Sequence, residues 1–393
     1  MIIRPHRDGD DEGIYRLARL AFGGPREPEP QVLWSNQKGW HGLVAEDAAA
    51  GGALVGELKV RDYRQFFGGS AVPMGGVASV AVDPHARGRG IASALLDAAL
   101  PVMRERGQVI SALYPTVPPL YRSRGWEQTG NYERAKIRPE LFAMLAKPSS
   151  SVPLERPGPD DLPALHDAYL RFASTVDGML DRSTAATELT DVLDLDVVEI
   201  VPGPDGSVRG FLTANRPDGE QLFTFDLIAH DEDAGRALLG NLGRWTGILS
   251  EIALRIVDPA WWQLLMTLPM LHDVTNHPWM LRVVDLPAAV AARGWPFAQY
   301  LAPCAVDLEV VDEHAPWHAG RHRLIADGGK VVCEPGGTGA VRLAARALGP
   351  WFAGSADTAM LRRAGLLTGD PADAQVLDLL TGAPHPVRMA DSF

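Results

Sequence analysis

The chain has 393 residues, of which 46% are hydrophobic and 22% are charged, so it carries enough apolar material for more than one buried core. Its formal net charge of −12 argues against a protein that binds nucleic acid or anionic membranes in general, because both need a basic surface. The first residues lack a signal-peptide pattern and no uncharged apolar run reaches about 18 residues, so we expect a cytoplasmic protein without a membrane span.

The first part of the chain alternates strands and helices. A short strand at 2–4 leads to a helix that begins after the acidic residues 8–11 and ends at the Gly pair 23–24. This pattern predicts a mixed α/β region that ends near residue 145. The remaining expected elements are strands at 41–60, broken by a turn at 48–52, strands at 74–82 and 109–114, and a helix at 90–104.

A second α/β region follows a linker at 147–153, which is polar and rich in Pro and Ser. A helix opens at 160–163, and the order of the later elements echoes the first region. We therefore interpret the two regions as a structural repeat. The later elements expected here are strands at 197–201, 208–214, 223–228 and 252–256, and a helix at 233–242.

Residues 280–284 lead into a third region with a different, α+β pattern. It opens with a capped helix start at 285–290 and contains a late helix at 370–380. Between these helices we expect antiparallel strands at 308–311, 321–326 and 331–334, with a tight turn at Asp327-Gly328-Gly329. The domain boundaries predicted from these patterns are 1–146, 152–284 and 285–393.

The strongest chemical signal is the segment 79–92, Ser-Val-Ala-Val-Asp-Pro-His-Ala-Arg-Gly-Arg-Gly-Ile-Ala. An apolar strand runs into a turn, a Gly-rich loop follows, and an apolar-periodic helix begins. Unpaired backbone N–H groups and the positive end of the helix dipole favour an anion at this point. Gly88 and Gly90 leave room for close approach and Arg87 and Arg89 add positive charge, so a pyrophosphate is the natural guest.

The loop Arg87-x-x-Gly90-x-Ala92 resembles the coenzyme A motif of the GNAT acetyltransferases, (Gln/Arg)-x-x-Gly-x-(Gly/Ala), and follows the expected strand. The resemblance implies acetyl-CoA as acyl donor and no metal. In that family the loop amides hold the pyrophosphate, and the preceding strand holds the acyl-pantetheine arm. The coenzyme-binding residues expected on this basis are Val80, Ala81, Val82, Arg87, Gly88, Arg89, Gly90, Ile91, Ala92, Ser93, Thr116 and Val117.

Tyr121 is the expected general acid. It lies in the segment 119–126, which resembles the GNAT segment where a helix-borne Tyr precedes a Gly-aromatic pair, here Gly125-Trp126, by four residues. In the family this Tyr lies near the thioester sulfur and can protonate the leaving thiolate. A phenol with a pKa near 10 suits such a late proton donor. The alternative interpretation is that Tyr121 packs in the core.

The order of the three regions, the chain length and the terminal Phe393 resemble the Eis (enhanced intracellular survival) family of aminoglycoside N-acetyltransferases. This resemblance implies tandem GNAT-like domains, a sterol carrier protein-like last domain, a homohexamer, and a small cationic acceptor of the aminoglycoside or polyamine type. It also implies that the Phe393 carboxylate is the general base and that Trp34 lines the acceptor pocket. Relatives often carry an acidic residue before the terminal Phe; Ser392 stands here, and Asp391 is the expected substitute.

Two other functions are compatible with the same sequence. One is an acetyltransferase for protein lysines or for mycothiol assembly, although mycothiol synthase lacks a third domain. The other is a lipid- or ligand-binding module with a vestigial acetyltransferase domain. The intact loop from Arg87 to Ala92 and the presence of Tyr121 argue against that second alternative.

Three further patterns carry weaker predictions. In the second region the acidic stretch 230–236 replaces the Gly-rich loop and would repel a pyrophosphate, so we predict no coenzyme there. The histidines 314, 318 and 322 recur every fourth residue, but Pro316 and Gly320 lie between them, so we expect a surface loop without a metal. The apolar run 261–271 gives a physical reason for assembly, since exposed apolar patches favour it.

Overall fold

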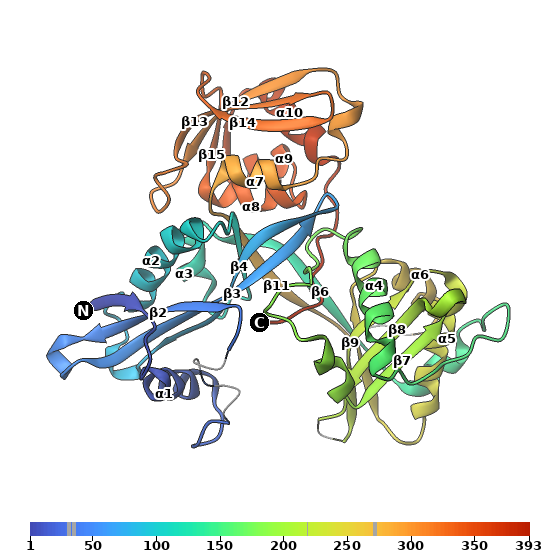
Figure 1. Ribbon diagram of the computed structural model, residues 1–393. Helices are drawn as coiled ribbons and strands as arrows, with labels where there is room; N and C mark the ends of the chain where they lie inside the picture. The colour runs from blue at the N-terminus through green and yellow to red at the C-terminus, as the bar shows by residue number, and fades with distance from the viewer. Residues whose placement is uncertain (30–32, 34–36, 218, 270–272) are drawn as a thin grey trace.

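The structure is a computed structural model that describes residues 1–29, 33, 37–217, 219–269 and 273–393. Trp34, the predicted acceptor-pocket residue, lies outside the described residues. The first eleven strands form a single sheet in the order β1-β2-β3-β4-β5-β11-β6-β10-β9-β8-β7, and a second, five-stranded sheet follows. Figure 1 shows two halves side by side, with the last region packed above their junction.

The first half of the large sheet follows the predicted order of strands and helices. Its core lies between the sheet and α2, where Leu58 and Val60 of β3 pack with Leu95 and Leu96. The other face of β3 carries polar residues such as Lys59, as expected from the two-residue period of a strand. The elements of this half are β1 (Ile2–Pro5), α1 (Asp11–Phe22), β2 (Trp40–Asp47), β3 (Ala53–Phe67), β4 (Ser70–Val82), α2 (Ile91–Glu105), β5 (Ile110–Leu113) and α3 (Pro118–Arg122).

The second half repeats this order around a core of its own. Strand β9 leads into helix α5, which is followed by strand β10 and the short helix α6, just as β4 is followed by α2, β5 and α3. The predicted linker at 147–153 has no regular structure. The elements of this half are α4 (Leu162–Ala173), β7 (Val197–Pro202), β8 (Val208–Asn215), β9 (Gln221–Ala229), α5 (Glu232–Leu242), β10 (Glu251–Ile256) and α6 (Ala260–Leu265).

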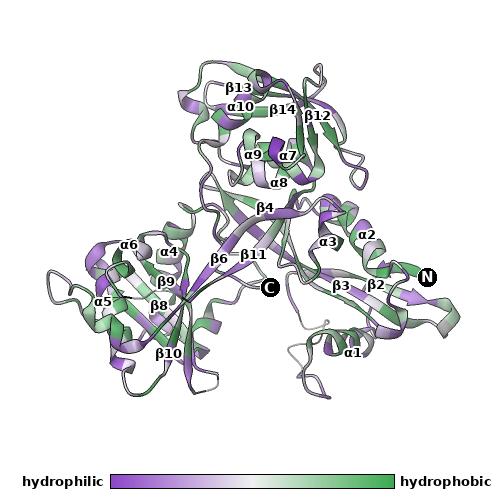
Figure 2. Cartoon of the chain, turned by 180° about the vertical axis from the view of Figure 1, so that it is seen from behind, coloured by the Kyte–Doolittle hydropathy of each residue, from purple (hydrophilic) through white to green (hydrophobic). Residues whose placement is uncertain are grey.

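Two strands cross between the halves. Strand β6 (Glu127–Ile137) belongs to the first half by sequence but pairs with β10 of the second, and β11 (Val274–Val283) follows the second half but pairs with β5 of the first. The view from behind in Figure 2 shows β6 and β11 at this junction. Residues 280–283, which lead into the third region along the chain, form the end of β11. We keep 1–146, 152–284 and 285–393 as a proposed domain division.

The third region is an α+β unit, as its pattern predicted. Its sheet has the order β14-β13-β12-β15-β16, and the predicted antiparallel strands form its first three members. Its largest apolar core continues into residues of β4, β5 and β11, so it is packed firmly on the first half. The elements are α7 (Leu286–Ala292), β12 (Cys304–Val311), β13 (Gly320–Asp327), β14 (Lys330–Pro335), β15 (Val341–Ala344), α8 (Ala345–Ala353), α9 (Thr358–Arg363), β16 (Leu367–Gly369) and α10 (Pro371–Thr381).

Two expectations about surface features were wrong. His318 and His322 are buried: the His318 ring donates to Asp312 at 2.9 Å and accepts from the Leu286 N–H at 3.0 Å, so it joins the start of α7 to the segment between β12 and β13. In the run 261–271, Trp261, Leu265 and Leu268 are buried in the core of the second half, and Trp262 and Leu264 are partly buried against it. Met266 is the one large apolar side chain of the described part of this run that is exposed, so the run forms no continuous apolar patch there. Residues 270–272 lie outside the described part.

Two kinds of feature are absent from the described residues. No group of three or more His, Cys, Asp or Glu side chains there is arranged to hold a metal ion. No helix within the described ranges combines the length and the apolar character needed to cross a membrane.

The C-terminal tail after α10 returns from the third region to the junction of the two halves, where Figure 1 shows it ending. Residues 387–390 are buried, with exposures of 7% or less. The Val387 carbonyl accepts from the Asn131 N–H of β6, and the Arg388 N–H donates to Asp177 of the second half. Arg388 also forms an ion pair with Glu133 at 2.9 Å. The tail is therefore held by both halves along its length.

Candidate active site

Strands β4 and β5 are paired at one end and separate at the other. Their parallel pairing runs from Met74 to Gly76 on β4, whereas β4 itself continues to Val82. Beyond Gly76 the edge of β4 that faces β5 has no partner strand among the described residues, so its main-chain N–H and C=O groups are available to a ligand. A cleft of about 480 Å³ opens there, between β4 on one side and Thr116 and Val117 on the other.

The Gly-rich loop forms one end of this cleft. Gly88 and Gly90 have left-handed φ values of +79° and +75°, and a Cβ at either position would point into open space. Gly90 precedes α2, and no side chain caps the free N–H groups of that helix. Free N–H groups at the positive end of a helix form an anion site.

The structure brings together eleven of the twelve predicted coenzyme residues. All except Arg89 line the cleft, and Arg89 instead forms an ion pair with Asp47 at 2.7 Å. Sequence reasoning missed the wall made by α1, since an exposed apolar residue at a helix end gives no specific signal. The additional lining residues are Ala21, Phe22, Ala86 and Leu120.

Tyr121 reaches the same cleft from α3. Its side chain is 6% exposed, and burial raises its pKa above the usual value, although a hydrogen bond with Thr116 opposes that shift. The phenol therefore stays protonated at neutral pH and can donate a proton.

The last residue of the chain lies where β4 and β5 part. The Phe393 ring packs on Gly76, where a Cβ would come within 2.9 Å of it, and against the rings of Tyr63 and Tyr114 at 5.2 and 5.9 Å. The Tyr114 hydroxyl donates to the Asp391 carbonyl at 2.7 Å. The chain terminus is thereby brought between the coenzyme-type cleft and the second half.

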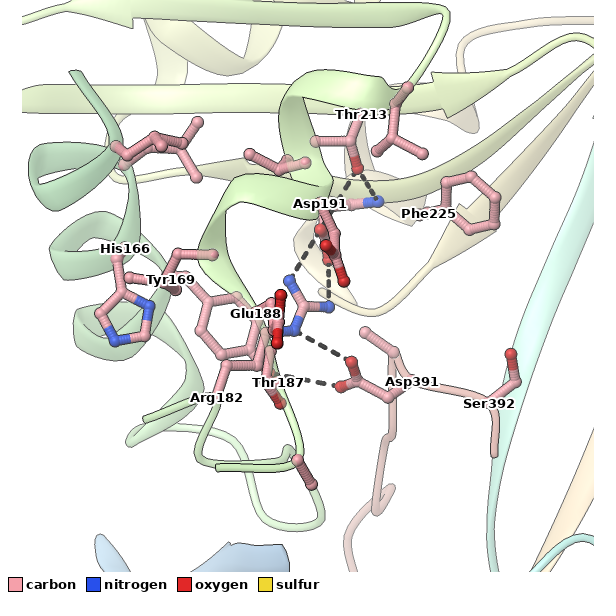
Figure 3. Close-up of a pocket in the computed structure, with 18 of the residues that line it drawn as sticks. His166, Tyr169, Arg182, Thr187, Glu188, Asp191, Thr213, Phe225, Asp391 and Ser392 are labelled. Carbon is pink, nitrogen blue, oxygen red and sulfur yellow. Dashed lines mark hydrogen bonds and ion pairs between the residues drawn. The ribbon is translucent and has the colours of Figure 1, made fainter. Parts of the chain in front are cut away.

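A second cavity, of about 440 Å³, lies between the halves and is lined by the tail residues Asp391 and Ser392 (Figure 3). Arg182 joins its two walls, because it donates to Asp391 at 2.9 Å and to Asp226 at 2.8 and 2.9 Å. Burial lowers the pKa of Arg182, but the charges of Asp226 and Asp391 outweigh burial and hold it well above its usual value. These three side chains therefore form one hydrogen-bonded group, in which two carboxylates share a single guanidinium.

Two other arginines that line the cavity have no carboxylate hydrogen-bonded to them among the described residues. Arg255 of β10 is 4% exposed and makes no side-chain hydrogen bond or ion pair with any described residue. Its guanidinium lies over the rings of Tyr132 and Phe225, at 4.6 and 5.7 Å from their centres. Such contacts are worth about 2 kcal/mol when desolvated, whereas burying an ion costs several kcal/mol. Arg61 of β3 donates to the Tyr63 hydroxyl, but its Nε is buried without a partner.

The rim of this cavity is acidic. Glu188 and Asp191 line the cavity and are exposed. The pKa of Asp191 is raised, first by the partial loss of hydration of its carboxylate and then by the negative charges of Glu188 and Asp194. Sequence analysis missed Arg61, Arg182 and Arg255, since lone arginines on separate strands carry no motif that a sequence could reveal.

Comparisons with known proteins agree with this geometry. Residues 2–129 match the acetyltransferase (GNAT) domain family and residues 286–389 match the sterol carrier protein domain family. An uncharacterised N-acetyltransferase of Streptomyces coelicolor is 27% identical, with 88% of each chain covered. N-acetyltransferase Eis of Mycobacterium tuberculosis is 26% identical over 98% of each chain.

A solved structure extends the likeness to the whole fold. The GCN5-related N-acetyltransferase of Kribbella flavida superposes with a TM-score of 0.81 at 27% identity, and covers 100% of this chain and 98% of its own. The chain accordingly carries a GNAT acetyltransferase domain first and a sterol carrier protein domain last, and over its whole length it is similar to N-acetyltransferases of the Eis type.

Proposed function

We propose that the protein transfers an acetyl group directly from acetyl-CoA to a primary amine at the junction of its two halves. The observation that carries this proposal is the buried C-terminal tail. It ends on Gly76, where β4 and β5 part, beside the cleft that holds the Gly-rich loop. A terminal carboxylate is thereby brought close to where a thioester would lie.

The donor would be held mainly by main-chain groups. The N–H groups of the loop and of the first turn of α2 would bind the pyrophosphate, with Arg87 adding positive charge. The acyl-pantetheine arm would then run between Val80–Val82 and Thr116. A free N–H of β4 near Val80 would polarise the thioester carbonyl, as a donor aimed at the developing oxyanion does in acyl transfer.

The acid and base roles follow from position and charge. The acceptor ammonium loses a proton to the Phe393 carboxylate, directly or through a water, and its nitrogen attacks the thioester carbon. The C–S bond breaks and Tyr121 protonates the thiolate, while the second proton that the nitrogen must lose passes through water to the tyrosinate and restores the phenol. The products are the N-acetylated amine, coenzyme A and one proton, which the Phe393 carboxylate releases to solvent. A terminal carboxylate has a pKa of about 3.5, so it serves best where burial raises its own pKa and lowers that of the ammonium.

The acceptor would enter through the cavity between the halves. Its acidic rim, formed by Glu188 and Asp191, favours a cationic amine. An aminoglycoside-type acceptor, a homohexamer and a cytoplasmic location remain predictions, as do the roles of Trp34 and Asp391. The Asp391 carboxylate already forms an ion pair with Arg182, so it would have to interact with Arg182 and with an incoming ammonium at the same time.

Moving the terminal carboxylate tests the proposal. Four residues added after Phe393 would displace it, and deleting Phe393 would shorten the reach by about 3.5 Å. Either change should lower kcat by roughly 10²–10⁴, the worth of a positioned proton acceptor, and leave the calorimetric Kd for coenzyme A unchanged.

Two controls distinguish the effect of the terminal carboxylate from the effect of the Phe393 ring and from the effect of adding four residues. Phe393→Leu keeps the terminal charge and should retain most of the turnover, and the same four residues at the N-terminus should have no effect. Tyr121→Phe should lower kcat, and the two losses should be less than additive if both groups act in one proton circuit. Wild-type turnover in the C-terminally extended protein would remove Phe393 as the base.

A further inference from the structure

The cavity between the halves contains a buried positive charge that the acetyl-transfer steps do not use. Arg255 lines this cavity at 4% exposure, and among the described residues it has neither a hydrogen-bond acceptor nor an ion-pair partner. The nearby carboxylate of Asp226 is already taken by two hydrogen bonds from Arg182. Buried charges are normally paired, because stacking on rings does not replace the lost hydration.

A second guanidinium lines the same cavity from the first half. Arg61 pairs in register with Gly76, the residue on which the Phe393 ring rests. Its Nε is buried without a partner, and its guanidinium carbon lies 4.1 Å from the centre of the Trp40 ring. The two arginines thus come from opposite halves, one near the terminus of the chain and the other across the cavity.

The charge pattern of the cavity is therefore divided. Its inner wall presents two guanidinium groups with free N–H donors, and its exposed rim presents the carboxylates of Glu188 and Asp191. A purely cationic acceptor would fit the rim but would leave the free N–H donors of Arg255 and Arg61 without an acceptor. An acceptor with both charges would match both surfaces, and guanidinium forks bind carboxylate and phosphate in a two-point geometry.

We infer that the acceptor is a primary amine that also carries an anionic group, a carboxylate or a phosphate, which binds to Arg255 with help from Arg61. This inference rests on the proposed acetyl transfer and narrows its substrate class. The anionic group would anchor the acceptor on the second half and direct its amine towards the Phe393 carboxylate.

Matched pairs of acceptors test the inference. Lysine and lysinamide differ by the carboxylate, and glucosamine 6-phosphate and glucosamine differ by the phosphate. The wild-type protein should show a kcat/KM at least about tenfold higher for the anionic member of one pair, since one charge-assisted bond is worth that much. The pair that shows the preference identifies the source of the anion.

Variants of Arg255 assign the preference to this side chain. Arg255→Met should reduce the preference to near one by raising KM for the anionic acceptor alone, and Arg255→Lys should restore part of it. A merely structural role would lower activity towards both members equally. Arg134→Met is the matched control, because Arg134 faces Arg255 across β6 and β10 and also lies over Tyr132, but it does not line the cavity. If Arg255→Met fails to fold, Arg61→Met supplies the same comparison.

The outcomes separate this inference from the proposed function. If both members of each pair are acetylated with equal kcat/KM, the anion site is overturned and the acetyltransferase activity stands. The same holds if the preference for the anionic member persists in Arg255→Met and in Arg61→Met. If no amine, an aminoglycoside included, is acetylated, the proposed function fails. Calorimetry with lysine and glucosamine 6-phosphate on the coenzyme A complex then decides: binding that is lost in Arg255→Met supports the site, and no binding overturns it.

Discussion

The two halves of the large sheet share one order of elements but differ at the start of a helix. In the first half α2 begins after Gly90, a left-handed residue without a side chain, so the N–H groups of its first turn stay free. In the second half α5 begins after Asp231, whose carboxylate accepts from the Ala234 N–H at 2.9 Å, and the acidic Glu232 and Asp233 follow. A carboxylate of the chain thus occupies the position where an anion would bind.

The short helix after the central strand differs as well. In the first half α3 presents Tyr121 to an open cleft. In the second half α6 presents Trp261, which is 3% exposed, donates to the Leu227 carbonyl of β9 at 3.0 Å, and packs on Gly235 of α5. The ring fills the region beside β9 that corresponds to the coenzyme cleft. One fold therefore supports a site in one half and a filled core in the other.

Removing the Trp261 ring should have the largest effect on stability. Trp261→Ala should lower the unfolding free energy by about 3–5 kcal/mol, measured by chemical denaturation, because it leaves a cavity in a packed core. The neighbouring Trp262 is only half-buried, so Trp262→Ala should cost less. Coenzyme A should still bind once per chain in both variants, because the acidic start of α5 remains. Calorimetry that finds a second site in Trp261→Ala would show that the ring alone closes the second half.

Giving the first half the acidic helix start of the second should remove coenzyme binding. In Gly90→Asp a carboxylate would cap α2 and repel the pyrophosphate, so the Kd for coenzyme A should rise at least about 100-fold, the worth of two charge-assisted hydrogen bonds. Gly90→Asn, which lacks the charge, should lose less.

A glycine of the second half provides the matched control for this change. Gly206 has a φ of +74° and open space before it, so Gly206→Asp introduces the same backbone strain away from the cleft. It should leave the Kd for coenzyme A unchanged. Equal losses of affinity in Gly90→Asp and Gly206→Asp would indicate general damage to the fold.

The smallest effect concerns the cap of α5. Asp231 also forms an ion pair with Arg209 at 2.7 Å, and the hydrogen bond from Arg209 lowers the pKa of Asp231. Asp231→Ala should cost about 1 kcal/mol of stability through the lost cap. Asp231→Asn keeps the cap and should cost only a few tenths, since the pair is exposed.

The difference in stability between the wild type and Asp231→Asn should depend on pH with a definite sign. A lowered pKa in the folded state contributes stability above the unfolded pKa of about 3.8, and this contribution is lost as pH falls through the folded value. The gap between the wild type and Asp231→Asn, measured by thermal unfolding, should therefore narrow as pH is lowered from 7 towards 3. A gap that widens would contradict the role given to Arg209.

The sequence alone determined the local features of the first half. Alternating apolar residues gave most strands, and the loop from Arg87 to Ala92 needs only a strand, two glycines and a helix start that are contiguous in the chain. The acidic residues at 231–233 likewise identified the second half as the one without a coenzyme loop. Such signals are local, because each depends on neighbouring residues and on the backbone conformations that they favour.

The cavity proposed for the acceptor was decided by tertiary structure. Strands β6 and β11 cross between the halves. The alternation of apolar and polar residues predicts a strand but does not predict its pairing partner. The tail, β3 and β10 bring Ser392, Arg61 and Arg255 to one cavity from positions far apart in the sequence. Whether an arginine is paired or free depends on which carboxylates the fold places within reach, and that is a property of the packed molecule alone.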